Sequence, residues 1–349
     1  MKIESRRLEE GAFELLIRMG ETEENARVAS GILVNADMRG ISTHGVNLLR
    51  RVHNRVKAGM LELPTRTTIV EDRNGTTVMD GNNGLGQVSA FNCLELTMEK
   101  AKKYGLSMVL LRKTNNIGAL GYYTSVAARR GLIQVLMTNG NPSMAPYGAA
   151  EPFFGTNPIS IGIPVKGDRP VFLDMSSSVV ARGKIRLASL KGEKIPEGWA
   201  LDENGEPTTD PKKALKGCML PLGGPKGSGL AMMVDILSGV LSGSNYSKAI
   251  KSFHTLEGPT GVGACFIGID PDRFMPAAHF YTLVERYVEE MKGLRRQRGV
   301  TEILAPGELE LNREESSSRE GIDVPDEVIR ELDSMCKELG STFSFIERS

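Results

Sequence analysis

The sequence predicts an α/β protein with a helical segment followed by a substantially parallel sheet. Three observations predict this class. Residues 8–58 carry apolar side chains at helical spacing. From residue 82 onward, helical stretches alternate with short apolar runs that suit buried strands. The 349 residues, 40% hydrophobic and 25% charged, are enough for about two domains with a substantial core.

The N-terminal segment is predicted to form three helices and then a hairpin. The first helix spans residues 8–19, the second follows the N-cap Thr22, and the third spans residues 47–58. Residues 67–79 are rich in β-branched side chains, and the turn dipeptide Asn74-Gly75 interrupts them. This pattern indicates two strands joined by a tight turn.

The remaining elements follow from the same patterns. Helices are expected at residues 88–103, 120–130, 230–241 and 326–339, and strands at 108–111, 132–137, 159–163 and 171–173. The acidic, polar stretch 307–320 is expected to be a loop. Because strands alternate with helices, the sheet is expected to be substantially parallel.

Charge and cysteine content argue against several classes of protein. Lys plus Arg and Asp plus Glu both number 43, so the net charge is zero, which argues against binding to nucleic acid or a membrane surface. The four cysteines are widely spaced, with no metal-ligand pattern, which indicates buried thiols in a reducing compartment. The N-terminus lacks a signal-peptide pattern, and no apolar run approaches the ~20 residues that span a bilayer. We expect a cytoplasmic protein with no metal site.

Two glycine-rich segments have a composition that is typical of phosphate-binding loops. Gly84-Leu85-Gly86 fails as a dinucleotide fingerprint, because Ser89 occupies the third glycine position and no strand frames it. The loop Gly223–Gly229 contains Lys226 and directly precedes the predicted helix at 230–241, so its N–H groups and its charge suit an anion. A flexible linker before a core helix explains the same pattern.

The turn Asp37–Gly45 contains an acid, an arginine, two hydroxyls and His44. A histidine on such a turn can transfer a proton near neutral pH, although a solvated surface histidine is the commoner case. No hydrolase motif accompanies it. Polar loops also follow two predicted strands, at Asn139-Gly140 and Asp174-Met175-Ser176, where ligands of α/β sheets often bind. Structural turns explain these loops equally well.

Taken together, these segments resemble the malate/L-lactate dehydrogenase family of NAD(P)-dependent oxidoreductases, which lacks a Rossmann fold. The most specific matches are ADMRGISTHGV, DGNNGLGQV, FFGTNPISIGIP, FLDMSSSVVARGKI and GGPKGSGLAMMVDILSGVLSG, with a weaker match at APGELE. The resemblance implies a central non-Rossmann nucleotide-binding sheet domain at residues 76–310. It also implies a helical domain built from the two chain ends, residues 1–75 with 311–349 packing back on it, and a homodimer.

The resemblance also implies site residues. His44 matches the proton donor, with Ser42 and Thr43 orienting the imidazole or the substrate. The cofactor is NAD or NADP, and the residues expected to bind it are Asn139, Gly140, Asp174, Met175, Ser176, Lys226, Pro306, Gly307 and Glu308.

Three substitutions depart from the family pattern. Asn116 stands where the family usually has a histidine, and an amide cannot transfer a proton. Leu48 replaces the arginine that holds the substrate carboxylate; Arg50 or Arg51 could substitute, although both point elsewhere on a helix. Ser228 replaces a commoner tyrosine.

We therefore predict an enzyme that interconverts a small 2-hydroxy acid and a 2-oxo acid, such as malate, lactate or sulfolactate. Its catalytic residues are expected to be His44 and Asn116, and its substrate-binding residues Ser42, Thr43 and Arg50. Its partner is a small-molecule carboxylate. The alternatives are a cyclic-imine carboxylate reductase of the same family, or a nucleotide-binding homologue with weak or no turnover.

Overall fold

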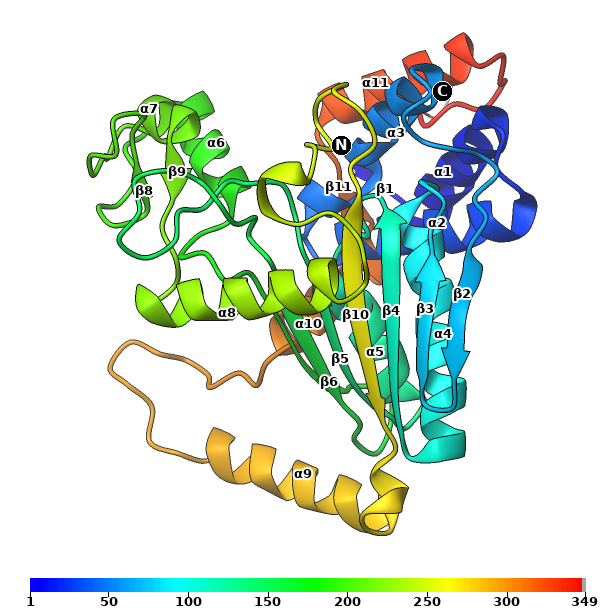
Figure 1. Ribbon diagram of the computed structural model, residues 1–349, viewed down its shortest axis with the longest axis vertical. Helices are drawn as coiled ribbons and strands as arrows, with labels where there is room; N and C mark the ends of the chain where they lie inside the picture. The colour runs from blue at the N-terminus through cyan, green and yellow to red at the C-terminus, as the bar shows by residue number, and fades with distance from the viewer. Residues whose placement is uncertain (347–349) are drawn as a thin grey trace.

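A seven-stranded sheet forms the centre of the computed structural model, which describes residues 1–346 (Figure 1). The strand order is β2-β3-β4-β10-β5-β6-β7. The strands are β2 (Thr68–Arg73), β3 (Thr76–Asp80), β4 (Leu106–Thr114), β5 (Ile133–Thr138), β6 (Ile159–Ile163), β7 (Val171–Met175) and β10 (Val262–Ile269). The hairpin and every strand predicted from the sequence are confirmed.

The direction of the strands corrects the prediction of a substantially parallel sheet. Within residues 1–346, β3 and β4 form the one parallel pair of this sheet, and the other neighbours are antiparallel. The strand β10, which was not predicted, causes this antiparallel arrangement at the centre of the sheet. It inserts antiparallel between β4 and β5, so that Cys265 faces both Leu110 and Met137. Two strands that would be neighbours in a parallel unit are thereby separated.

Helices cover both faces of the sheet. The helices α4 (Gly86–Tyr104) and α5 (Leu120–Arg129) pack on one face, and α8 (Pro225–Asp235) crosses the other (Figure 1). The first face buries Leu94, Tyr123 and Phe266, and the second buries Val234 against the sheet. A single π-helical turn, Ile236–Val240, continues α8.

The helix α8 begins five residues earlier than predicted. Its N-cap is Gly224, with a φ of 64°, and Pro225 occupies the first turn, where a missing N–H costs nothing. The segment predicted as a glycine-rich loop is therefore mostly helix. Gly227 explains the composition, because a Cβ there would lie 2.6 Å from the backbone oxygens of Leu222 and Ser177. Gly227 therefore serves close packing, whereas Gly223 and Gly224 adopt the positive φ that the turn before the helix requires.

A helical cap lies at one end of the sheet, where the two ends of the chain meet (Figure 1). It contains α1 (Ser5–Met19), α2 (Glu23–Met38), α3 (Leu49–Lys57) and α11 (Asp326–Glu338), and β1 (Lys2–Ile3) pairs with β11 (Ile322–Asp323). The cap has its own apolar core, which includes Leu16, Leu49 and Met335. The proposed boundaries of the two domains stay a prediction, and residues 347–349 lie outside the described part of the chain.

Two helices in the C-terminal third differ from expectation. Residues 307–320, predicted as a loop, form α10 (Glu308–Glu320). Gly307 starts this helix, Glu308 and Glu310 stabilise the positive end of its dipole, and Leu311 anchors it in the core. The unpredicted α9 (Ala277–Lys292) extends away from the body and contains no fully buried residue (Figure 1).

A small lobe beside the sheet completes the molecule (Figure 1). It contains α6 (Arg182–Lys191), α7 (Pro211–Lys216), β8 (Ala200–Leu201) and β9 (Cys218–Met219). Ile185 of α6 and Met219 of β9 are buried in its core. Among the described residues, no helix has both the length and the apolar character needed to cross a bilayer.

Candidate active site

His44 lies on a short turn, η1 (Ser42–His44), that follows α2. Asp37 holds this turn, because the backbone N–H of Val46 donates a hydrogen bond to its Oδ2 at 2.8 Å. Gly45 leaves the room that the carboxylate needs: a Cβ there would overlap Asp37. On the other side, Thr43 Oγ1 lies 3.0 Å from His44 Nδ1. A carboxylate and a hydroxyl therefore fix the position of the imidazole.

The electrostatics of this turn keep the imidazole neutral. Burial lowers the pKa of His44 to about 4, and the neighbouring His254 acts in the same direction. Burial also raises the pKa of Asp37 to about 7, against the opposing effect of the hydrogen bond from Val46. In the free protein at neutral pH, His44 carries no charge.

Two of the predicted substrate-side residues have structural partners. Arg50 forms ion pairs with α11, because its Nη1 lies 2.8 Å from Glu338 Oε2 and its Nε 3.4 Å from Glu331 Oε1. Asn116 closes its own loop, since its Oδ1 accepts a hydrogen bond from the N–H of Gly118 at 2.9 Å. The structure thus directs Arg50 toward α11 and leaves Ser42 and Thr43 exposed beside His44.

A group of basic residues near His44 was not predicted from the sequence. The helix α6 packs on the His44 turn, because a Cβ at Gly183 would lie 3.0 Å from Thr43 Cγ2. Arg182 and Arg186 of this helix both lower the pKa of His254. Their spacing of four residues, which places them on one face of a helix, was the signal available in the sequence.

The predicted cofactor residues gather at one edge of the sheet. Asp174 of β7 is solvent-accessible and accepts a hydrogen bond from the N–H of Gly121 at 2.7 Å. Desolvation of its carboxyl group raises the pKa of Asp174 to about 6, against the opposing effect of the hydrogen bond from Gly121. The segment Pro306-Gly307-Glu308 lies against the same strand, because the N–H of Phe172 donates to Pro306 O at 3.1 Å.

The start of α8 joins this edge. The N–H of Leu222 donates to the backbone oxygen of Ser177 at 2.9 Å, which brings Lys226 near the end of β7. Lys226 is exposed on the first turn of α8. Met175 and Ser176 are half-buried between the two elements. We call this surface, formed by Gly140, Asp174–Ser176, Lys226 and residues 306–308, the cofactor strip.

Two predicted cofactor residues support the strip from behind. The side-chain amide of Asn139 is buried and fully used: it donates to Asp235 Oδ1 at 2.8 Å and to Asn245 O at 2.9 Å, and it accepts from the N–H of Gly263 at 2.9 Å. Glu308 binds Lys292 of α9 at 2.7 Å. These side chains therefore fix the backbone of the strip.

The strip fits a dinucleotide. Apart from its two chain neighbours, no part of residues 1–346 comes within 4 Å of an ideal Cβ at Gly140, so a ligand can approach the backbone closely there. The first turn of α8 offers the positive end of the helix dipole and the charge of Lys226 to a pyrophosphate. The accessible carboxylate of Asp174 suits the hydroxyls of a ribose.

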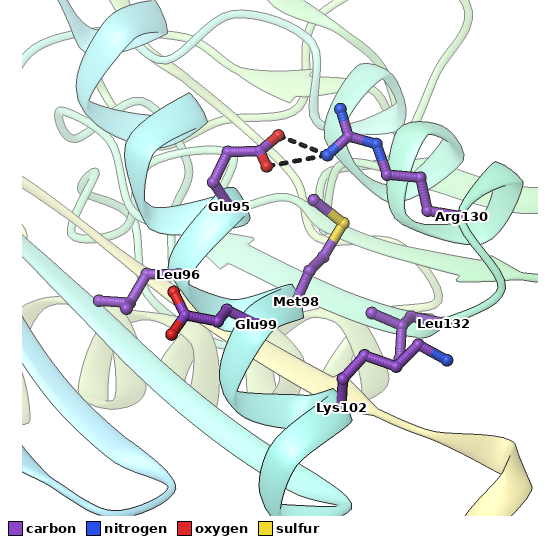
Figure 2. A pocket seen from close by; sticks show the side chains of 7 residues that line it. All are labelled: Glu95, Leu96, Met98, Glu99, Lys102, Arg130 and Leu132. Atoms are coloured by element: carbon purple, nitrogen blue, oxygen red, sulfur yellow. Dashed lines mark hydrogen bonds and ion pairs between the residues drawn. The ribbon is translucent and has the colours of Figure 1, made fainter.

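A separate pocket lies between α4 and the end of α5 (Figure 2). It is lined by Glu95, Leu96, Met98, Glu99, Lys102, Arg130 and Leu132. Two of its charged side chains form an ion pair with each other: Arg130 Nη1 lies 2.6 and 2.8 Å from the carboxylate oxygens of Glu95. None of the predicted site residues lines this pocket, so we do not assign it to the active site.

Comparison with known proteins places this geometry in a family. Residues 3–333 match the sequence model described as malate/L-lactate dehydrogenase. This chain belongs to the malate/L-lactate dehydrogenase family. It is 38% identical to the L-sulfolactate dehydrogenase of Methanocaldococcus jannaschii over 94% of each chain. It is 37% identical to the malate dehydrogenase of Pyrococcus horikoshii over 93% of this chain and 92% of that relative.

Solved structures agree. The sulfolactate dehydrogenase from M. jannaschii superposes with a TM-score of 0.93 at 36% identity, covering 98% of both chains. The malate dehydrogenase from P. horikoshii gives a TM-score of 0.90 at 34% identity, covering 98% of this chain and 97% of that one. The predicted family and the predicted α/β fold class are confirmed.

Proposed function

We propose that this chain is an NAD(P)-dependent dehydrogenase that interconverts a small 2-hydroxy acid and the corresponding 2-oxo acid. The observation that carries the proposal is the connection between the cofactor strip and the His44 turn. The guanidinium of Arg39, which ends α2, lies 5.1 Å from the ring centroid of Phe172 in β7. Farther along the same segment, Gly183 contacts Thr43. The chain segment 172–183 therefore connects the cofactor strip with the turn that carries His44.

The names of the relatives support the same chemistry. Malate and sulfolactate are 2-hydroxy acids, and dehydrogenases for both are similar to this chain over nearly its whole length. Two other relatives carry their cofactor in their names: a ureidoglycolate dehydrogenase (NAD(+)) of Escherichia coli and a (2R)-3-sulfolactate dehydrogenase (NADP(+)) of Chromohalobacter salexigens. The predictions of a nicotinamide-dependent dehydrogenase and of NAD or NADP as cofactor agree with these names.

The residues of this chain have distinct roles in the proposed reaction. A bound nicotinamide supplies the hydride in the direction of reduction. In its protonated form, His44 gives the proton to the oxygen that becomes the hydroxyl, and Thr43 orients its imidazole through Nδ1. Asn116 contributes at most a hydrogen bond. Lys226 and Asp174 hold the cofactor.

A second candidate function has a specific observation in its favour. The delta1-piperideine-2-carboxylate reductase from Pseudomonas syringae has a TM-score of 0.85 at 26% identity and covers 96% of this chain. A cyclic imine also accepts a hydride and a proton. The substrate panel below includes one for this reason.

We also propose that the protein is a cytoplasmic homodimer. The helix α9 and its surroundings expose large apolar side chains, among them Phe274, Tyr287 and Leu294. The α8 side of the sheet exposes Met232 and Leu241. Apolar surface of this extent is typical of an interface. The four buried, unpaired cysteines support a reducing compartment.

The test is turnover of NADH or NADPH with pyruvate, oxaloacetate, sulfopyruvate and a cyclic imine carboxylate, followed by nicotinamide absorbance. We expect oxidation of the cofactor with at least one oxo acid. The variant His44→Asn should lower the rate by ~10²–10⁴ and leave cofactor affinity unchanged. Turnover of the imine alone would favour the second candidate. Cofactor binding without turnover of any compound would refute both.

A further inference from the structure

Position 48 cannot hold the substrate carboxylate in this chain. Leu48 is 2% exposed and packs in the core of the helical cap with Leu49 and Val52. Arg50, two residues later, is bound to the carboxylates of Glu338 and Glu331. An oxo acid that approaches His44 therefore needs a cation from elsewhere.

The helix α3 supplies one such cation. Arg51 and Arg55 lie four residues apart, so they extend from the same side of the helix. Arg55 is 1% exposed, and its guanidinium donates to the backbone oxygens of Ser252 at 3.3 Å, Thr255 at 2.7 Å and Gly258 at 2.7 Å. Arg55 therefore fixes the loop of residues 252–258 beneath Arg51.

That loop carries His254. Phe253 is buried, and its ring centroid lies 5.3 Å from the guanidinium carbon of Arg55. The neighbouring His254 is exposed. The N–H of His254 donates to Ser252 Oγ at 3.1 Å. The loop is thus held from inside by Arg55 and offers His254 at the surface, beside the helix that carries Arg51.

The helix α6 contributes two further arginines near His44. Its first turn contacts Thr43, as described above, and Arg182 and Arg186 lie on one face of it. Arg51, Arg186 and Arg182 all lower the pKa of His254, and His254 in turn lowers that of His44. Among residues 1–346, no acidic group contributes to either pKa, and Glu331 is the one acid that acts on the pKa of Arg51.

Such a concentration of positive charge is unfavourable in the free protein, because like charges repel. An anion placed among these side chains removes the repulsion and gains charge-assisted hydrogen bonds. We propose that Arg51, Arg186 and His254 form the subsite that binds the carboxylate of the substrate beside His44, and that Arg182, whose Nη2 donates to Leu215 O at 2.9 Å, adds its charge nearby. We call it the basic subsite. This inference rests on the proposed function and assigns its substrate-binding residues.

The test measures binding and turnover separately. Oxalate is the binding probe, because it resembles a 2-oxo acid but cannot accept a hydride. Calorimetry should show that Arg51→Met and Arg186→Met each weaken oxalate binding by ~10–100-fold, the loss expected for one charge-assisted hydrogen bond. The KM for the oxo acid should rise by a similar factor, with cofactor affinity unchanged. Arg186 is exposed, so its variant keeps the test valid even if Arg51→Met fails to fold.

Two further variants sharpen the test. Lys184→Met is the matched control, because Lys184 lies on α6 between the two arginines and points to another side of the helix. It should leave oxalate binding unchanged. His254→Gln removes the charge but keeps a hydrogen-bonding side chain, and it should weaken oxalate binding most below pH 6.

The outcomes separate this inference from the proposed function. Oxalate binding that depends on Arg51 and Arg186, in a protein that turns over no oxo acid, would support the basic subsite and refute the proposed function. Turnover of an oxo acid with a KM unaffected by Arg51→Met and Arg186→Met would overturn the basic subsite. A loss of oxalate affinity in Arg50→Met instead of Arg51→Met would overturn it as well.

Discussion

Replacing Gly45 by alanine tests whether Asp37 holds the histidine turn in place. The backbone at Gly45 has a φ of −92°, which any residue adopts, so the substitution introduces no backbone strain. The added Cβ would, however, overlap the Asp37 carboxylate. To make room, Asp37 must turn away and release the N–H of Val46, which it now binds at 2.8 Å.

The size of the effect follows from this geometry. Leaving a partly buried polar group without its partner costs about 1–3 kcal/mol. We therefore expect Gly45→Ala to lower the free energy of unfolding by that amount. The activity should fall further than the stability does, because a displacement of ~1 Å of a catalytic group can cost ~10²-fold in rate. The kcat should drop by at least tenfold at saturating cofactor.

Urea unfolding and steady-state kinetics measure the two effects. Gly31→Ala is the control, because Gly31 lies inside α2 and a Cβ there meets only Glu9 Oε1 at 3.6 Å. That variant should gain ~0.5–1 kcal/mol from helix propensity and keep its kcat. If Gly45→Ala unfolds like the wild type and retains its kcat, Asp37 does not position His44.

Three further predictions concern the cofactor, pH and assembly. Lys226→Ala should weaken binding of NADH or NADPH by ~10–100-fold in calorimetry, and unchanged dissociation constants for both would exclude Lys226 from the strip. Because burial raises the pKa of Asp37 from 3.8 to about 7, its contribution to stability is complete below pH 4 and is lost as the pH rises through 7. Asp37→Asn should remove this part of the decline in unfolding free energy, and an identical pH profile would contradict the shift. Sedimentation equilibrium at micromolar concentration should give twice the mass of the chain, and a monomer would contradict the proposed dimer.

Local patterns predicted most of the elements, and long-range pairing could not be predicted in the same way. The strand 159–163 was placed correctly because turn residues bound its apolar run. Nothing near Cys265 in the sequence shows that it pairs with Leu110 and Met137, more than a hundred residues away. The direction of the sheet depends on that insertion. The start of α8 was misplaced because glycine usually disfavours a helix, whereas Gly227 is required there by close backbone contacts.

Some parts of the candidate site could likewise be predicted from local patterns, and one part could not. The His44 turn and the cofactor strip consist of short contiguous segments, so motifs pointed to them. The basic subsite draws its residues from α3, α6 and the loop 252–258, which only tertiary packing brings together. Arg50 and Arg51 illustrate the difficulty, since one residue is a rotation of ~100° on a helix. The position of Glu338 on α11 determines which of the two is free to face a substrate.

In the proposed reaction, we expect binding of an anion at the basic subsite to be coupled to protonation of His44. Asn116 cannot transfer a proton and is engaged with Gly118, so His44 is left as the proton donor of the proposed reaction. Burial, and to a lesser extent His254, lower the pKa of His44 to about 4 in the free protein. We expect a carboxylate bound by Arg51 and His254 to supply the opposite charge and to raise that pKa toward its ordinary value. A neutral ketone would leave His44 deprotonated and the reduction without its proton. Selectivity for acids then follows from protonation of the catalytic histidine as well as from the affinity of the arginines.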